Sequence, residues 1–348
     1  MSGEPVLDRG AVEARAVGRV RLGVLGARSW IATEAVIPAI EASDQVELVA
    51  VAAAGGPVPE RLAHLDAGSY DDVLADPRVE AVYLPLANGL HRTWIERAAA
   101  AGKHVLCEKP LGVDASDAAV AADACSRAGV LLAEAWMTPF GARWAEVVSL
   151  AASGALGDVR HLRGEFTFTI GVDQSANYRW DPAQGGGALL DVGIYALGAA
   201  VALWGPDPVA VAASRRLTDA GVDATTSLWC DWGGGRTASA LVSFELPERQ
   251  NLEIVGTSGR VVVDGPAFTG GAAASSFERY DVDGSLTVVV APGNDPYLAM
   301  VDAFARAVRG GASWPRPIGD VVALATLLDR LASAGPSPLI RSGGPGVP

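Results

Sequence analysis

Residues 102–111 have the sequence Gly102-Lys103-His104-Val105-Leu106-Cys107-Glu108-Lys109-Pro110-Leu111. Residues 103–107 predict a short buried strand, and Pro110 ends it because proline has no N–H to donate to a neighbouring strand. A lysine at the carboxyl end of a strand in an α/β sheet points into the crevice where such sheets bind ligands. Lys109 is therefore a candidate functional residue, although most lysines are only solvated surface charges.

Four further apolar segments accompany this strand and alternate with helical patterns. Strands are predicted at residues 19–26, 47–53, 79–86 and 130–133, and the main helices at 31–41, 89–101 and 114–129. This alternation is typical of a parallel, doubly wound sheet. The first strand ends at Gly26, and a glycine turn before a helix either holds a pyrophosphate or is an ordinary turn. We therefore predict a dinucleotide-binding domain at residues 19–137.

The pattern changes after residue 137. Alternating segments predict strands at residues 159–168, 209–217, 225–231, 237–244, 250–256, 260–264 and 285–290. Helices are predicted at 140–153, within 173–204, at 296–308 and at 320–334. Residues 138–335 are therefore expected to form an α+β domain with a large, open, mainly antiparallel sheet. Residues 1–18 and 336–348 are expected to be a flexible lead-in and tail.

The composition limits the kinds of molecule that the protein is expected to bind. The formal net charge of −13 argues against nucleic acid, whose binding needs a basic face, and is compatible with a neutral or cationic small molecule. The three cysteines have no metal-like spacing, so we expect reduced core residues, no metal site and a cytoplasmic protein. Residues 1–20 do not have the pattern of a signal peptide, and no apolar run predicts a membrane span.

A second informative stretch is Gly185-Gly186-Gly187-Ala188-Leu189-Leu190-Asp191-Val192-Gly193-Ile194-Tyr195. Asp191 and Tyr195 are four residues apart, so a helix places them on one face. With Lys109 they could move a proton to or from a hydroxyl or carbonyl, and the lysine charge is expected to lower the pKa of the tyrosine. The glycine run is expected to allow close approach to something flat. The alternative is an aspartate that favours the helix dipole and a tyrosine packed in the core.

Together, the two stretches resemble the glucose–fructose oxidoreductase/inositol dehydrogenase (Gfo/Idh/MocA) family. The resemblance extends over about residues 20–334, and it includes Leu84-Pro85-Leu86-Ala87-Asn88-Gly89-Leu90-His91 and Gly256-Thr257-Ser258-Gly259-Arg260. It implies an N-terminal Rossmann domain and a C-terminal α/β domain for substrate binding and oligomerisation. It also implies NAD(P)-dependent redox chemistry on a small sugar-type molecule, in a homodimer or homotetramer.

The resemblance further implies roles for individual residues. Lys109 corresponds to the catalytic lysine of the family, and Asp191 and Tyr195 fall where the family has an aspartate followed by histidine or tyrosine. The tyrosine resembles the branch that includes sugar ketoreductases. The implied cofactor-binding residues are Gly26, Arg28, Ser29, Trp30, Ile31, Ala53, Leu84, Pro85, Asn88, His91, Glu108, Lys109 and Arg179.

Three departures from the family pattern bear on cofactor and substrate. The turn after Gly26 has one residue more than is usual. Residues 53–56 (Ala-Ala-Gly-Gly) provide neither the Ser-Arg pair of NADP users nor the acid of NAD users, and the missing cation favours NAD over NADP. Pro139 and Gly141 stand where the family often has arginine and histidine, which predicts an unusual substrate pocket.

Three functions are therefore compatible with the sequence. The favoured one is an oxidoreductase that transfers a hydride between NAD(P) and a secondary hydroxyl or ketone. Its substrate would be a sugar, an aminoglycoside or a cyclitol in a specialised biosynthetic pathway, and the acidic net charge would suit a cationic one. The alternatives are an NAD-dependent glycosidase of the same family and a non-catalytic dinucleotide-binding sensor. The Lys109, Asp191 and Tyr195 set argues against a sensor, which has no need of a proton donor.

Overall fold

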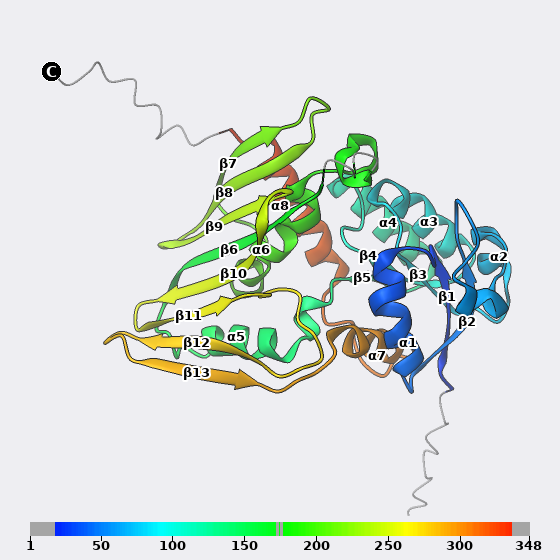
Figure 1. Ribbon diagram of the computed structural model, residues 1–348, viewed down its shortest axis with the longest axis horizontal. Coiled ribbons are helices and arrows are strands. Elements are labelled where there is room, and N and C mark those ends of the chain that lie inside the picture. The colour runs from blue at the N-terminus through cyan, green and yellow to red at the C-terminus, as the bar shows by residue number, and fades with distance from the viewer. Residues whose placement is uncertain (1–17, 172–173, 175–176, 336–348) are drawn as a thin grey trace, which may run out of the picture.

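The computed structural model describes residues 18–171, 174 and 177–335, in two domains that lie side by side (Figure 1). The first domain contains a sheet of five parallel strands in the order β2-β1-β3-β4-β5. The strands are β1 (Val20–Leu25), β2 (Val46–Ala52), β3 (Ala81–Leu84), β4 (His104–Glu108) and β5 (Leu132–Ala135). The predicted Rossmann sheet is confirmed. Its order reverses at β1 and β3, which is where such sheets bind ligands.

Helices join these strands. They are α1 (Ile37–Ala42), α2 (Tyr70–Ala75), α3 (Asn88–Ala100) and α4 (Ala115–Ala128). The helix predicted at residues 31–41 is split, because Ala32–Val36 form a π-helical turn before α1 begins. A π turn takes in one residue more than an α turn, and Pro38 near the start of α1 removes one N–H donor there. The π turn directly follows the turn after Gly26, which has one residue more than is usual in the family.

The second domain contains eight strands in the order β13-β12-β11-β10-β6-β9-β8-β7. Only β6 and β9 are parallel neighbours, so the prediction of a large, mainly antiparallel sheet is confirmed. The strands are β6 (Val159–Thr169), β7 (Ala210–Leu217), β8 (Asp223–Gly233), β9 (Arg236–Ser243), β10 (Glu245–Gly256), β11 (Gly259–Asp264), β12 (Ser275–Asp281) and β13 (Leu286–Ala291). The sequence prediction missed β12, whose residues are mostly polar and follow a Gly/Ala/Ser run.

Helices α5 (Ala142–Ala152) and α6 (Ala188–Trp204) cover one face of this sheet (Figure 1). Helix α6 packs on β6, β8 and β9 and is buried along most of its length. This burial explains its almost continuously apolar sequence, since a helix that is apolar on all sides needs partners on all sides. Asp191 and Tyr195 are thereby carried on a helix that is fixed in the core of the domain.

The last two helices return to the first domain. Helix α7 (Pro296–Val308) packs on α1, and α8 (Ile318–Ser333) packs on both α4 and α6. Arg309, at the end of α7, binds the carboxylate of Glu80 and the carbonyl of Arg19. The boundary predicted at residue 137 therefore marks a change of sheet, while the helices after residue 295 belong to the packing of both domains.

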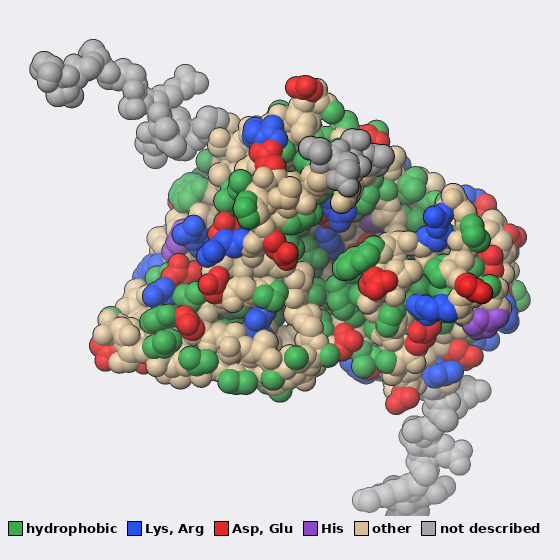
Figure 2. Space-filling view, in the orientation of Figure 1, with side chains coloured by type: hydrophobic (Ala, Val, Ile, Leu, Met, Phe, Trp, Pro, Cys, Tyr) green, Lys and Arg blue, Asp and Glu red, His purple; other side chains and the backbone are tan. Residues whose placement is uncertain are grey.

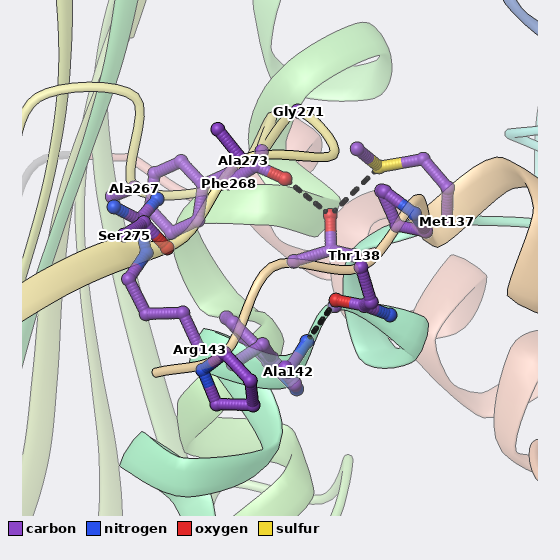
Figure 3. Close-up of a pocket in the computed structure, with 15 residues that line it drawn as sticks. Met137, Thr138, Ala142, Arg143, Ala267, Phe268, Gly271, Ala273 and Ser275 are labelled. Carbon is purple, nitrogen blue, oxygen red and sulfur yellow. Dashed lines mark hydrogen bonds between the residues drawn. The ribbon is translucent and has the colours of Figure 1, made fainter. Parts of the chain in front are cut away.

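A loop between β11 and β12 packs against the segment that follows β5 (Figure 3). Thr138 Oγ1 donates a hydrogen bond of 2.8 Å to the carbonyl of Phe268, and the Ala142 N–H donates one of 2.7 Å to Asn294. Gln250 Oε1 accepts from the N–H groups of Phe268 and Thr269. Thr138 thus holds the loop against the segment that follows β5, Gln250 of β10 holds the loop from the sheet, and Asn294 ties the segment after β13 to the start of α5.

No helix in the described part of the chain is long and apolar enough to cross a lipid bilayer. Cys107, Cys125 and Cys230 are all buried and free, and the described residues contain no cluster of three or more His, Cys, Asp or Glu side chains that could hold a metal ion.

Candidate active site

A cleft of about 760 Å³ lies between the two domains, at the carboxyl ends of β3 and β4. Figure 2 shows the molecule hollowed there, with basic side chains deep in the hollow. Ten of the predicted site residues line this cleft: Ser29, Trp30, Ile31, Pro85, Asn88, Glu108, Lys109, Arg179, Asp191 and Tyr195. Gly26, Arg28, Ala53, Leu84 and His91 do not belong to its lining.

An ion triad forms the floor of the cleft. Lys109 Nζ lies 2.8 Å from Asp191 Oδ1, and Arg179 Nε lies 2.7 Å from Asp191 Oδ2. Lys109 Nζ also donates a 2.6 Å hydrogen bond to the Asp191 carbonyl. Burial alone would raise the pKa of Asp191, but the charges of Arg179 and Lys109 outweigh it and hold that pKa well below its usual value. Asp191 is therefore a buried, ionised anchor for two cations.

Backbone contacts set the position of Asp191. Asp223 of β8 accepts a 2.8 Å hydrogen bond from the Leu189 N–H and a second one from the Thr226 hydroxyl. A side chain of the neighbouring sheet therefore caps the start of α6. Gly187 has φ +124°, and a Cβ there would collide with the Asp223 carboxylate. A Cβ at Gly186 would lie 2.5 Å from the Arg179 carbonyl. The prediction that the glycine run receives something flat is therefore wrong, because the run packs against the protein itself.

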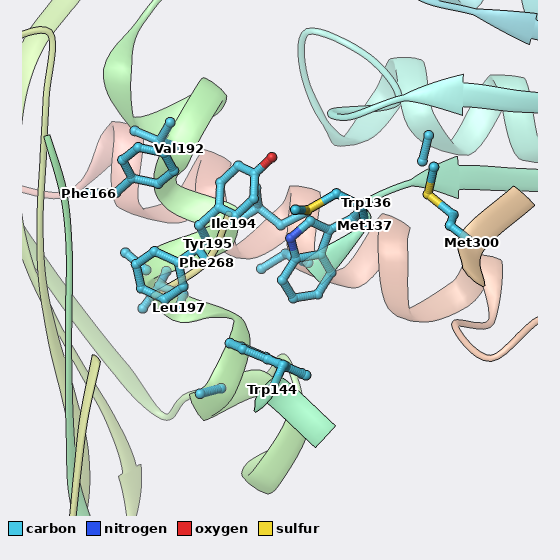
Figure 4. Packing of buried hydrophobic residues seen from close by; sticks show 14 of the residues in the cluster. Trp136, Met137, Trp144, Phe166, Val192, Ile194, Tyr195, Leu197, Phe268 and Met300 are labelled. Atoms are coloured by element: carbon cyan, nitrogen blue, oxygen red, sulfur yellow. The ribbon is translucent and has the colours of Figure 1, made fainter. Parts of the chain in front are cut away.

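Tyr195 rests on an aromatic cluster. Its ring contacts Trp136, Phe166 and Phe268, and Figure 4 shows its hydroxyl directed away from these rings. Lys109 Nζ lies 5.0 Å from the centre of the Tyr195 ring. The predicted lowering of the Tyr195 pKa is wrong: burial raises the pKa well above its usual value, and the Glu108 and Asp191 carboxylates add to the rise. Tyr195 is therefore a neutral phenol at physiological pH.

Glu108 forms the wall beside Lys109. Tyr83, on the neighbouring strand β3, donates a 2.7 Å hydrogen bond to Glu108 Oε1. Burial raises the pKa of Glu108 to about 7, against the opposing effects of the Tyr83 hydrogen bond and the Lys109 charge. The carboxyl therefore changes charge near neutral pH.

Asn88 and His91 stabilise the loop that follows β3. Asn88 Nδ2 donates a 2.9 Å hydrogen bond to the Gly185 carbonyl, which joins the two domains beside the cleft. His91 is buried between the carbonyls of Pro110 and Leu86, with its ring nitrogens 2.7 and 3.0 Å away. Burial lowers the pKa of His91 to about 4, so it is neutral. His91 and the fully buried Leu84 act on the cleft through the backbone they support.

The turn after β1 has the shape of a dinucleotide cradle. Gly26 has φ +114°, and a Cβ there would lie 3.0 Å from the Leu86 side chain and 3.1 Å from the Pro85 carbonyl. Only glycine allows this approach, which brings the turn beside the loop after β3. Ser29, Trp30 and Ile31 then face the cleft. These residues fit a bound dinucleotide, whose phosphates favour a glycine turn at the start of a helix.

Arg28 lies at the edge of this cradle, near Ala53 at the end of β2. Its Nη1 donates a 2.6 Å hydrogen bond to the Gly55 carbonyl. Residues 53–56 carry no cation of their own, but the turn after β1 places the Arg28 guanidinium beside them. No local sequence signal indicates this contact, because Arg28 and Gly55 are 27 residues apart.

Several cleft residues were missed by sequence reasoning. They are Phe166, Phe168, Tyr178, Glu248, Gln250, Thr269 and Tyr297, which come from strands, a loop and α7. Only Tyr178 had a local signal, since it adjoins Arg179. The others meet through the tertiary fold, and no spacing along the chain marks them.

Comparisons with known proteins agree with this site. Residues 20–135 match the model described as "Oxidoreductase family, NAD-binding Rossmann fold", and residues 144–262 match the "GFO/IDH/MocA C-terminal domain". The D-xylose 1-dehydrogenase (NADP(+)) 2 of Haloferax volcanii is 38% identical over 294 residues, which are 83% of this chain and 89% of the relative. The chain belongs to the Gfo/Idh/MocA family.

The proteins that resemble the chain include a reductase of a nucleotide-linked sugar and a 3-ketoreductase. The dTDP-3,4-didehydro-2,6-dideoxy-α-D-glucose 3-reductase of Saccharopolyspora spinosa is 36% identical over 307 residues, 86% of this chain and 90% of the relative. The crystal structure of KijD10, a 3-ketoreductase from Actinomadura kijaniata in complex with NADP and TDP-benzene, superposes with a TM-score of 0.84. The superposition covers 91% of this chain and 98% of KijD10 at 30% identity. This Gfo/Idh/MocA protein is thus an NAD(P)-dependent oxidoreductase of a sugar-modifying family.

Proposed function

We propose that this protein reduces a ketone, or oxidises the matching secondary alcohol, on an unphosphorylated sugar, aminoglycoside or cyclitol, in a specialised biosynthetic pathway. The observation that carries the proposal is the meeting of Lys109, Asp191 and Tyr195 in a cleft that is also lined by Ser29, Trp30 and Ile31, which follow the Gly26 turn. A bound nicotinamide cofactor supplies hydride transfer at such a site. The side chains around it have only to orient the substrate and move one proton.

Tyr195 is the proposed proton donor in the reducing direction. Because burial raises its pKa, the phenol keeps its proton at neutral pH and can donate it to the carbonyl oxygen of a ketone. The carbonyl carbon gains a hydride and its oxygen gains this proton, which gives the alcohol. The positive charges of Lys109 and Arg179 lie close enough to stabilise the phenolate that remains.

Lys109 and Asp191 act as a unit in this proposal. Asp191 is fixed by the cap on α6 and holds the lysine ammonium by two hydrogen bonds. A lysine fixed in this way presents a constant charge to the reacting oxygen, and it loses little side-chain freedom when substrate binds. This pre-organisation is the main electrostatic contribution that a rigid site makes to catalysis.

The charges of the cleft support a substrate without phosphate groups. Among the described residues that line it, Lys109 and Arg179 are the cations, and both are bound to Asp191. Glu248 adds a carboxylate at the opposite wall, and Gln250 and Thr269 add neutral polar groups. A diphosphate would meet no unpaired cation there, whereas hydroxyl or amino groups would find acceptors.

A substrate panel tests the proposal. Steady-state oxidation of NADPH and NADH is followed with keto forms of free sugars, cyclitols and aminoglycosides, and with a TDP-linked 3-keto sugar. We expect turnover with a free or amino-substituted substrate and little with the TDP-linked one. Turnover of the TDP-linked sugar alone would overturn the substrate class. Release of an aglycone without net oxidation of NADPH would indicate the glycosidase alternative.

We also propose that the protein forms a homodimer or homotetramer through the large sheet. The edge strand β13 exposes Leu286, Val288 and Val290, at 51, 57 and 67% of their surface, on one face. An apolar stripe of this kind on a sheet favours association. Light scattering after size exclusion measures the oligomer, and Val288→Glu is expected to weaken it; a wild-type monomer would contradict the proposal.

A further inference from the structure

We propose that Arg28 binds the 2′-phosphate of NADP and makes this protein select NADP over NAD. The inference rests on the proposed function, since it requires a dinucleotide in the Gly26 cradle. It reverses the preference for NAD that residues 53–56 favoured when they were considered alone. In this inference the side chain that binds the 2′-phosphate comes from the turn after β1. The segment after β2 contributes only a backbone carbonyl, which holds that side chain.

The position of the guanidinium carries the inference. In a dinucleotide fold, the residue after the second strand meets the ribose hydroxyls of the adenosine, and its charge decides between a 2′-hydroxyl and a 2′-phosphate. In this chain the corresponding segment is Ala53-Ala54-Gly55-Gly56, which has no charged side chain. Arg28 reaches over that segment and donates its 2.6 Å hydrogen bond to the Gly55 carbonyl.

The absence of a side chain at Gly56 leaves room for the guanidinium of Arg28. A Cβ at Gly56 would lie 2.5 Å from Arg28 Nη1 and 3.2 Å from its Cζ, and the φ of Gly56 is +152°. The backbone after β2 therefore leaves room for a guanidinium and holds it by one carbonyl. This arrangement fixes a cation at the place where the fold presents the ribose.

The guanidinium keeps most of its donors for a ligand. Arginine has five N–H groups, and among the described residues Arg28 uses one of them, on Gly55. No carboxylate of the described chain forms an ion pair with it, in contrast to the exposed Arg61, which lies 2.7 Å from Glu41. A planar guanidinium with unpaired donors is suited to bidentate binding of phosphate.

The test is a set of binding titrations that do not depend on turnover. The change in nicotinamide fluorescence on binding reports the affinity for NADPH and NADH. Calorimetry with 2′,5′-ADP isolates the adenosine and its 2′-phosphate. The wild-type protein is expected to bind NADPH about 10-fold or more tightly than NADH, as a charge-assisted bidentate contact would provide.

Four variants separate recognition from structure. Arg28→Ala is expected to weaken NADPH and 2′,5′-ADP by about 10- to 100-fold and to leave NADH within about twofold, because one charged contact is lost. Arg28→Lys keeps a charge without the fork and should give an intermediate affinity. Gly56→Ala displaces the guanidinium without removing it and should weaken NADPH in the same direction. Arg61→Ala, an exposed arginine that is already paired, is the matched control and should change neither affinity.

The outcomes distinguish this inference from the function on which it rests. If Arg28→Ala weakens NADPH and NADH equally, Arg28 only supports the turn and the inference is wrong. Equal wild-type affinity for NADPH and NADH would also overturn it while leaving the proposed function intact. If the wild-type protein binds neither dinucleotide, the proposed function itself fails.

Discussion

Lys109 Nζ holds both the carboxylate and the backbone carbonyl of Asp191, at 2.8 and 2.6 Å. The two residues come from different domains, since Lys109 follows β4 and Asp191 lies in the first turn of α6. This double contact fixes the ammonium group in direction as well as in position. It also ties the cofactor domain to the substrate domain at the point where hydride and proton must meet.

Replacing Lys109 by alanine should abolish the stabilisation of charge at the reacting oxygen. We expect kcat to fall by about 10²- to 10⁴-fold, the range usual for a group that assists proton transfer. The affinity for NADPH, followed by the change in nicotinamide fluorescence on binding, should change much less. Lys103→Gln is the matched control: within the described part of the chain Lys103 donates to the carbonyls of Asp76 and Val79, away from the cleft, so its loss should lower stability and spare kcat. Full activity of Lys109→Ala would refute the assignment.

Tyr195→Phe removes the phenolic oxygen and keeps the ring on its aromatic cluster. Because the hydroxyl points away from the cluster, we expect the midpoint of thermal unfolding to stay within a few degrees. The kcat for ketone reduction should fall by about 10²-fold or more, as is usual for loss of a general acid. A wild-type kcat in Tyr195→Phe would show that Tyr195 is not the proton donor, and Lys109 would then be the candidate donor.

Asp191→Ala should unfold more easily than the wild type. The substitution leaves the Lys109 and Arg179 cations at a buried site without their shared carboxylate. Breaking a buried pair in this way costs about 3–5 kcal/mol, and partial exposure of Arg179 places the expected loss near the lower end. Urea unfolding of the variant and the wild type measures it. A loss below about 1 kcal/mol would mean that the triad is weakly coupled.

Glu108 should make stability fall as pH rises through neutrality. Its folded pKa of about 7 lies above its usual value of 4.5, so its contribution is complete below pH 4.5 and is lost as pH rises through 7. Glu108→Gln lacks this titration. The free energy of unfolding of the wild type relative to Glu108→Gln should therefore decrease by about 2 kcal/mol between pH 5 and pH 8. A constant difference would contradict the raised pKa.

Glu80 should show the opposite dependence. The Arg309 hydrogen bonds are the main cause that lowers the pKa of Glu80 to about 2, with Arg21 adding to it. Its contribution is complete above pH 4.5 and is lost as pH falls toward 2. We expect the advantage of the wild type over Glu80→Gln, about 1–2 kcal/mol at pH 6, to shrink steadily toward pH 3 in urea titrations. An advantage that grows on acidification would exclude this role.

Much of the fold could be predicted because its signals are local. The parallel strands are short apolar runs between helices, and Pro110 marks the end of β4 where Lys109 enters the cleft. Because Asp191 and Tyr195 are four residues apart, the sequence predicted that they lie on the same face of a helix. Strand β12 escaped prediction because its residues Ser275–Asp281 are largely polar, and an edge region of an exposed sheet needs few apolar side chains.

Prediction of the site stopped where contacts join distant segments. The pKa of Tyr195 depends on the depth of its burial and on Glu108, neither of which can be read from a local pattern. Arg28 reaches Gly55 only because β1 and β2 are neighbours in the sheet. Phe166 and Tyr297 reach the cleft from β6 and α7. Each of these relationships requires the tertiary structure.

The return of the last two helices restricts how this chain can be divided. Val321 of α8 completes the apolar core that Ala118, Ala121 and Cys125 of α4 begin. Arg309 meanwhile fastens the carbonyls of Gly18 and Arg19 at the start of β1. A fragment that stops at residue 137 would expose this core to water, and a ribosome must synthesise nearly the whole chain before the first sheet is fully covered. A chimera that exchanges cofactor domains between relatives must therefore carry α7 and α8 with residues 18–137.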